Sequence, residues 1–200
     1  MQKLPIPDLV VAIDLGASLS KVAAVDAKGN YKLLAALSDI AQTPVGSIKQ
    51  VDSQFWGERI PESRSWVVTG DGAFVTGEYA KNHFRGRNNL KLSKLDEAVP
   101  KILSLLWILA QKYDFGNSFT IKLGVLLPSG ECAEGDIQEL QDRLIPCLKN
   151  FETPTGKIKI KLQSLEIKPE GAGVYVHRRL NISQEVLVKT RLGILGIGYR

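Results

Sequence analysis

The sequence predicts an α/β protein built on a mixed β-sheet. The chain opens with two successive hairpins of short apolar strands, and strands that alternate with helices follow them. Hairpin strands pair antiparallel and helix-linked strands pair parallel, so the sheet has to contain both kinds of pair. With 44% hydrophobic and 24% charged residues, the 200-residue chain is typical of globular proteins, which excludes a disordered tail, a collagen-like repeat and a disulfide-rich mini-protein.

Short apolar or alternating runs in the first part of the chain predict strands. They are Leu9–Asp14, Lys21–Asp26, Tyr31–Leu37, Ser65–Thr69 and Ala73–Thr76. The first run is continuous and rich in β-branched residues, which is typical of a buried strand. A turn at 27–30 closes the second hairpin, whereas the segment 43–62 is mixed and rich in turn residues, so we expect no regular element there.

Longer periodic segments follow, of which Leu95–Tyr113 is the most apolar. Its hydrophobic residues are too continuous for a narrow stripe, so we expect a helix that is buried on most sides, with Pro100 in its first turn or at a small break there. A basic segment, Lys81–Lys94, precedes it and is expected to form a loop. The remaining predicted elements are a strand at Phe119–Leu127, a helix at Asp136–Phe151, a strand at Lys157–Ile167, a short helix at Val174–Leu180 and a strand at Glu185–Ile197.

The chain has 26 lysines and arginines against 21 acidic residues, which gives a net charge of +5. A nucleic-acid-binding protein is expected to gather its basic residues on one face, with aromatic platforms or a reading motif beside them. Here Lys157, Lys159 and Lys161 alternate with isoleucine, which predicts the solvated face of a half-buried strand. Direct binding to nucleic acid is therefore not expected.

Cys132 and Cys147 are the only cysteines, and the chain has two histidines and no C-x-x-C motif. A zinc site needs three or four ligands at characteristic spacings, so none is expected. The count allows one disulfide, but we expect both thiols to be reduced, as in cytoplasmic proteins. The start of the chain has no signal-peptide pattern, and no apolar stretch approaches the ~20 residues that span a bilayer, so we expect a cytoplasmic protein without a membrane partner.

The first candidate site is the turn between the first two strands, from Asp14 to Lys21. Gly16, Ala17 and Ser18 are small, so their backbone amides can face an anion such as a phosphate. Lys21 can reach the same phosphate as a point charge, and Asp14 can hold Mg²⁺ directly or through water. The alternative is a plain hairpin turn, whose aspartate accepts backbone N–H groups and whose lysine is solvated.

The second candidate is Glu170, which follows a predicted strand and is itself followed by Gly171 and Gly173. Each glycine weakens a helix by roughly 1 kcal/mol, so the pair favours a backbone that a ligand approaches closely. Glu170 could then orient or deprotonate a water that attacks a phosphoryl group, or, alternatively, only stabilise a helix N-terminus. The third candidate is Gly196 with Gly198, a Gly-x-Gly after a strand, which also occurs in ordinary turns.

Taken together, these segments resemble the actin-like ATPase superfamily, and most closely its ParM/StbA-like plasmid-segregation branch. The similarity covers nearly the whole chain and implies an RNase-H-like lobe. It identifies the first turn as the phosphate-1 loop, with Asp14, Gly16 and Lys21 on the aspartate, the glycine and the phosphate-contacting lysine of that loop. It also places Glu170 on the glutamate that positions the hydrolytic water, and the turn at 127–130 on a conserved turn of the family.

The resemblance implies binding of ATP or GTP with Mg²⁺, hydrolysis of the nucleotide by the complete form, and self-association into filaments for plasmid segregation, with a DNA-bound adaptor protein as a partner. In the phosphate-2 loop Gly196 stands where the family has a metal-linked aspartate, and Gly198 aligns with the glycine. The chain ends in that loop, so we expect residues 1–200 to form the N-terminal lobe without the second lobe, and to be inactive alone. Its core would comprise 1–42 and 95–200, with an inserted subdomain at about 43–94.

Two other functions stay open. A non-catalytic lobe could keep the fold and act as a protein-interaction module, which Gly196 and the missing second lobe favour. The second function is that of a sugar- or acid-kinase-like member of the same superfold, because a fold does not fix a function. No substrate-binding constellation in the sequence points to it. Titration with Mg-nucleotide distinguishes a nucleotide-binding lobe from the interaction module.

Overall fold

The two opening hairpins form one side of a mixed sheet. The structure, a computed structural model, describes residues 5–55, 60–88, 93–173 and 177, and the statements below concern these residues. The strand β1 (Leu9–Leu15) pairs antiparallel with β2 (Leu19–Asp26), which pairs antiparallel with β3 (Tyr31–Leu37). On its other side β1 pairs parallel with β7 (Ser118–Leu127), and β7 pairs parallel with β9 (Gly156–Pro169). The predicted α/β class with a mixed sheet is therefore confirmed.

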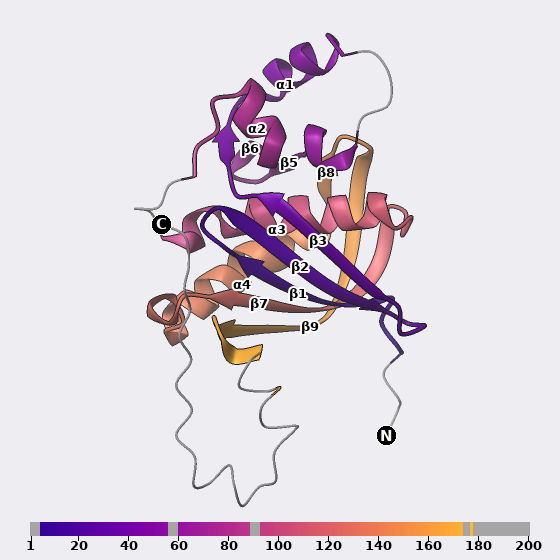
Figure 1. The fold of residues 1–200 in the computed structure, drawn as a ribbon, viewed down its shortest axis with the longest axis vertical. Coiled ribbons are helices and arrows are strands. Elements are labelled where there is room, and N and C mark those ends of the chain that lie inside the picture. The colour runs from indigo at the N-terminus through magenta and orange to yellow at the C-terminus, as the bar shows by residue number, and fades with distance from the viewer. Residues whose placement is uncertain (1–4, 56–59, 89–92, 174–176, 178–200) are drawn as a thin grey trace, which may run out of the picture.

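The long strand β9 carries the sheet into a second part of the molecule (Figure 1). Its first residues pair antiparallel with β8, and the described strands follow the order β3-β2-β1-β7-β9-β8-β5-β6-β4. The additional strands are β8 (Phe151–Thr153), β5 (Trp66–Thr69), β6 (Gly72–Thr76) and β4 (Ile40–Gln42). In β9 the lysines between 157 and 161 are exposed and the isoleucines between them are buried, as the alternation predicts.

One face of the sheet packs against α3 (Lys94–Lys112) and α4 (Glu134–Leu148), which lie behind the strands in Figure 1. Alternate residues of each strand point to that face because side chains alternate along a strand. In β1, Val11 and Ile13 are at most 1% exposed, whereas Val10 is 50% exposed. The predicted buried strand is therefore buried on one face and open on the other.

The helix α3 is buried on most sides, as its sequence predicts, with Leu103, Leu106 and Trp107 fully buried. The indole N–H of Trp107 has a hydrogen-bond partner inside the protein, since Nε1 donates to Thr155 Oγ1 at 3.0 Å. The main apolar cluster joins α3 to α4 and to the strands β1, β2, β7 and β9. No helix of the described residues is both long and apolar enough to cross a membrane.

Pro100 lies in the second turn of α3, beyond the first turn where it was expected. Proline has no N–H, so the carbonyl of Asp96, four residues earlier, loses its helical donor. Arg143 of α4 takes the place of that donor, since its Nη2 donates to the Asp96 carbonyl at 3.2 Å. Its Nη1 donates to the Leu95 carbonyl, also at 3.2 Å. The N–H that Pro100 lacks thus leaves the Asp96 carbonyl open to the Arg143 side chain, which joins α4 to α3.

The segment 43–94 contains two helices, among its described residues, that the sequence does not predict. The helix α1 (Val45–Asp52) lies in the stretch 43–62, where turn residues predict no regular element, and α2 (Gly77–His83) covers the start of the basic segment that is predicted to be a loop. Both helices are too short for a clear apolar period, and Ile48 is the buried residue of α1. A second apolar cluster joins the two helices to the neighbouring strands; it consists of Ile48, Trp66, Ala73, Val75, Tyr79 and Ala80.

Other differences from the predicted elements are small. The helix predicted at Asp136–Phe151 ends at Leu148, because Phe151 begins β8. The described part of the chain also contains two short 3-10 turns, η1 (Pro61–Arg64) and η2 (Ser129–Glu131). The predicted helix at 174–180, apart from His177, and the predicted strand at 185–197 lie outside the described residues.

The contact of Arg143 predicts an energetic coupling with Pro100. Arg143→Ala leaves the Asp96 carbonyl without a donor, which is expected to lower the free energy of unfolding by about 1–3 kcal/mol. Pro100→Ala restores the helical N–H, so in that background Arg143→Ala is expected to cost ~1 kcal/mol less. Urea unfolding of the four chains measures this cycle. Equal costs in the two backgrounds would show that the arginine does not replace the missing donor.

Candidate functional site

The carboxyl ends of three parallel strands meet at one edge of the sheet. Asp14, near the end of β1, is in register with Leu126 of β7, and Leu127 is in register with Pro169 of β9. The N–H of Glu170 donates to the carbonyl of Leu127 at 2.7 Å, which ties the turn after β9 to the end of β7. Turns that are far apart in the sequence therefore lie together, at the edge where open α/β sheets bind ligands.

The turn 16–18, which follows β1, is held by two serines. Ser38 donates its hydroxyl to the carbonyl of Gly16 at 2.6 Å and its N–H to the carbonyl of Ser18 at 3.1 Å. The buried hydroxyls of Ser38 and Ser20 are 2.9 Å apart. The carbonyls of Gly16 and Ser18 thus accept hydrogen bonds, whereas the N–H groups of the turn donate no backbone hydrogen bond within the described residues. Such N–H groups are suited to an anion.

A polar cleft of about 200 Å³ lies between this turn and the start of α3. It is lined by Leu15, Gly16, Ala17, Asn88, Ser93, Lys94, Glu97, Lys101, Pro128 and Glu131. Lys101 donates to Glu97 at 2.7 Å, one turn apart on α3. The cleft therefore combines the small residues of the first turn with charged side chains from α3 and from the turn after β7.

Lys94 connects Glu170 to the cleft. The Lys94 ammonium pairs directly with Oε1 of Glu170, and the two side chains are 24% and 42% exposed. Close by, Glu131 caps α3, since its Oε2 accepts from the Ser93 hydroxyl at 3.0 Å and from the Leu95 N–H at 3.2 Å. Gly16 and Ala17 of the predicted turn therefore line the cleft, whereas Glu170 does not line it and is connected to it through Lys94.

Lys94 and Glu131 are site residues that the sequence does not reveal. In the sequence Lys94 is one of the basic residues of the segment 81–94, and no short-range pattern relates it to a glutamate 76 residues later. One usable signal was present: Ser93 directly before an apolar period is an N-cap signature. It would have placed Lys94 at the first position of a helix that begins beside the turn of residues 127–130.

The structure places Asp14 and Lys21 beside the cleft rather than in it. They are cross-strand partners, with Lys21 Nζ 4.0 Å from Asp14 Oδ2 and side chains 66% and 34% exposed. Both line a hollow on the sheet face opposite α3, at the same edge as the turn 16–18. Among the described residues no three His, Cys, Asp or Glu side chains are grouped as metal ligands. Gly196 and Gly198 lie outside the described residues.

The pKa of Cys132 is raised by its surroundings at this edge. Burial, and then the carboxylates of Glu131, Asp136 and Glu170, raise the pKa of the Cys132 thiol above its ordinary value. Burial is also the largest cause of the raised pKa of Cys147. Both cysteines are free thiols. Because their pKa values are raised, both stay protonated at neutral pH.

Comparison with known proteins finds similar folds only among solved structures, since neither a family model nor a curated protein matches the chain. An archaeal actin homolog, Ta0583, in complex with ADP matches with a TM-score of 0.56 and 21% identity, over 88% of this chain and 49% of that chain. Bacillus thuringiensis ParM in its apo form matches with a TM-score of 0.55 and 18% identity, over 85% and 48%. AlfA from the B. subtilis plasmid pLS32, a filament structure, matches with a TM-score of 0.52 and 12% identity, over 84% and 58%.

These matches identify the fold. The chain has an actin-like fold similar to that of ParM, which confirms the resemblance expected from the sequence. It spans about half the length of the first two solved structures.

Gly16 is expected not to tolerate a side chain. A Cβ at this position would lie 2.2 Å from the carbonyl oxygen of Leu19, a backbone atom that cannot move without distorting the turn. Gly16→Ala should therefore lower the free energy of unfolding by about 1–3 kcal/mol, measured by urea unfolding. The control is Gly130→Ala at the same edge, where a Cβ has no atom within 4 Å, so stability should change by less than ~0.5 kcal/mol. Equal stabilities of the two variants would show that the backbone does not approach position 16 as closely as the structure indicates.

The raised pKa of Cys132 predicts slow alkylation. Only the thiolate reacts, so at mildly alkaline pH Cys132 should react with iodoacetamide more slowly than free cysteine. Glu170→Gln removes one of the charges that raise this pKa, so the rate–pH profile of Cys132 should move to lower pH. Mass spectrometry of the modified peptides separates the two thiols, and Cys147 serves as the internal control. If the Cys132 profile does not move, Glu170 is not close to this thiol in solution.

Proposed function

We propose that the chain is a nucleotide-binding lobe of an actin-like protein, and that the cleft between the turn 16–18 and α3 receives the polyphosphate of ATP or GTP. The proposal rests on the convergence at one sheet edge of unused backbone N–H groups, the Lys94 ammonium and the Glu170 carboxylate. A polyphosphate needs several donors and cations at close range. Solved structures of similar fold include a complex with ADP and one with ATP.

In this proposal the N–H groups of Gly16, Ala17 and Ser18 bind phosphate oxygens. Asp14 and Lys21 lie beside the cleft, on the other face of the sheet, so they act on the part of the polyphosphate that extends past the turn 16–18. There Lys21 would add positive charge, and Asp14 would hold Mg²⁺ together with phosphate oxygens and waters; when bound, the ion neutralises charge on the phosphates. One carboxylate fits such an ion, because Mg²⁺ in nucleotide sites keeps several waters and is held mainly through the phosphates.

Glu170 has the role of orienting and deprotonating the attacking water. In the structure the Lys94 ammonium occupies its Oε1. A phosphate in the cleft would compete for that ammonium, and the carboxylate oxygen would then be free to accept a proton from water. Lys94 would thus link arrival of the phosphate to availability of the base.

For the complete form we propose Mg-dependent hydrolysis of ATP or GTP in the cytoplasm, and assembly into filaments that segregate plasmid DNA through a DNA-bound adaptor. The similarity in fold to ParM and to the AlfA filament structure supports this part of the proposal. The 200-residue chain alone is expected to bind nucleotide weakly and not to turn it over.

Substitutions at Lys21 and Glu170 should separate binding from turnover. Calorimetric titration with Mg-ATP and Mg-GTP is expected to show weak binding by the chain, weakened a further ~10-fold by Lys21→Ala because a charge-assisted contact is lost. Glu170→Ala should leave the affinity unchanged or increase it, because it frees the Lys94 ammonium. In the complete form the same substitution should abolish phosphate release.

The matched control for Lys21 is Lys122→Ala, an exposed lysine of β7 away from this edge, which should bind as the unmodified chain does. Unchanged hydrolysis by a complete form that carries Glu170→Ala would refute the role of the glutamate. No binding by the unmodified chain at millimolar nucleotide would favour the non-catalytic interaction module.

A further inference from the structure

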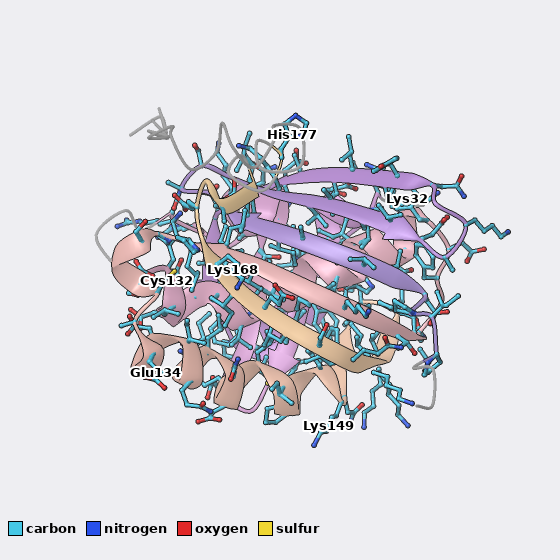
Figure 2. The ribbon with its side chains drawn as sticks, turned by 90° about the horizontal axis from the view of Figure 1, so that it is seen from below. Lys32, Cys132, Glu134, Lys149, Lys168 and His177 are labelled. Carbon is cyan, nitrogen blue, oxygen red and sulfur yellow. The ribbon has the colours of Figure 1, made fainter. Side chains whose placement is uncertain are left out.

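A small cavity lies between the sheet and α3, where the second part of the molecule joins them. The centre of a water molecule can occupy about 10 Å³ of it. It is lined by Ser20, Ala36, Leu37, Thr76, Gly77, Lys101, Ser104, Leu105 and Ile108. In Figure 2 the sheet lies in front of the helices, so the cavity is behind the sheet in that view. Three elements that are distant in the sequence, β2, β6 and α3, thus each contribute a hydroxyl to its lining.

The hydroxyl of Ser104 has no hydrogen-bond partner within the protein. The residue is 2% exposed, and its Oγ is buried and unpaired. A serine inside a helix can bond back to the carbonyl four residues earlier, here that of Pro100, but Ser104 does not do so. Buried hydroxyls nearly always have a partner, either a protein group or an ordered water. An unpaired hydroxyl on the wall of a cavity therefore indicates a polar ligand in that cavity.

The other two hydroxyls of the lining, those of Ser20 and Thr76, already use their hydrogens elsewhere. A hydroxyl has one hydrogen, and Ser38 donates its own to the Gly16 carbonyl at 2.6 Å. Ser38 can therefore only accept from Ser20, whose Oγ is 2.9 Å away. Thr76 donates its hydroxyl to Ser65 Oγ, also at 2.9 Å. Ser20 and Thr76 thus offer only acceptor oxygens to a ligand in the cavity.

We infer that this cavity binds one buried water molecule. The water donates one hydrogen to Ser20 Oγ and the other to Thr76 Oγ1, and it accepts the hydroxyl hydrogen of Ser104. Three hydrogen bonds are usual for a buried water, and the volume is that of one water. An anion does not fit, because two of the three hydroxyls can only accept. A cation does not fit either, because the Lys101 side chain lines the same cavity.

The water joins the turn 16–18 to parts of the molecule that do not touch it directly. From Ser20 the hydrogen bonds continue through Ser38 to the carbonyl of Gly16. On the other side of the water lie α3, through Ser104, and the end of β6, through Thr76. The water therefore supports the shape of the turn from behind. The inference does not depend on nucleotide binding.

The sign of one stability change tests the inference. If a water accepts the Ser104 hydroxyl, Ser104→Ala removes a hydrogen bond, and the unfolding equilibrium constant should rise about 5-fold relative to the control. If the cavity is dry, the same substitution removes an unpaired hydroxyl, and stability should stay the same or increase. The control is Ser47→Ala in α1, a half-buried serine whose side chain has no hydrogen bond with a described residue. It allows for the higher helix propensity of alanine, and urea unfolding of the 200-residue chains measures both variants.

A high-resolution crystal structure of the unmodified chain locates the ligand directly. It should show one water within hydrogen-bond distance of the side-chain oxygens of Ser20, Thr76 and Ser104. In Ser104→Val, whose methyl groups occupy the cavity, that water should be absent. A dry cavity, or a Ser104 hydroxyl bonded to the Pro100 carbonyl, overturns the inference. So does a Ser104→Ala chain that is as stable as the control or more stable, because the hydroxyl would then have had no partner to lose.

Discussion

The parallel register of β1, β7 and β9 is the constraint on which the rest of the structure depends. It places three features at one edge of the sheet: the turn 16–18, the turn that follows Leu127, and Glu170. Apolar burial fixes this register, because Ile13 and Val125 are register partners and both are fully buried on the face that packs against the helices. A slip of one residue would move a whole set of buried side chains to the other face. The geometry of the cleft is therefore a consequence of the core.

Features with a strong local period were predictable from the sequence. The helix α3 follows from a long apolar segment, and the exposure pattern of β9 follows from the alternation of lysine and isoleucine. The turn 16–18 as a phosphate site and Glu170 as the base stay predictions; their signals are the small residues after an apolar strand and the glycines after the glutamate. Each of these signals lies within a few residues in the sequence, so no knowledge of the tertiary structure was needed.

Features that depend on contacts between distant segments were not predictable in the same way. The pairing of Lys94 with Glu170 exists only because α3 begins where β9 ends, and α1 and α2 are too short to show a period of their own. The position of Asp14 is a different case. Adjacent strand residues point to opposite faces, so once Leu15 is assigned to the buried side, Asp14 has to face the other side of the sheet.

The two faces of β1 and its end have different roles. Its odd-numbered residues form the core with α3, its even-numbered residues form the open apolar face, and its final turn forms one wall of the cleft. Positions 10 and 12 are exposed, so a polar residue there would be hydrated at no cost to the core. Packing against α3 therefore does not explain why both residues are apolar. The Asp14–Lys21 pair borders both the open face and the edge that bears the cleft, and both of its charges are in contact with water. Hydration offsets most of the attraction between two exposed charges 4.0 Å apart, so the pair adds little to the stability of this edge, and either side chain can take a new partner at little cost.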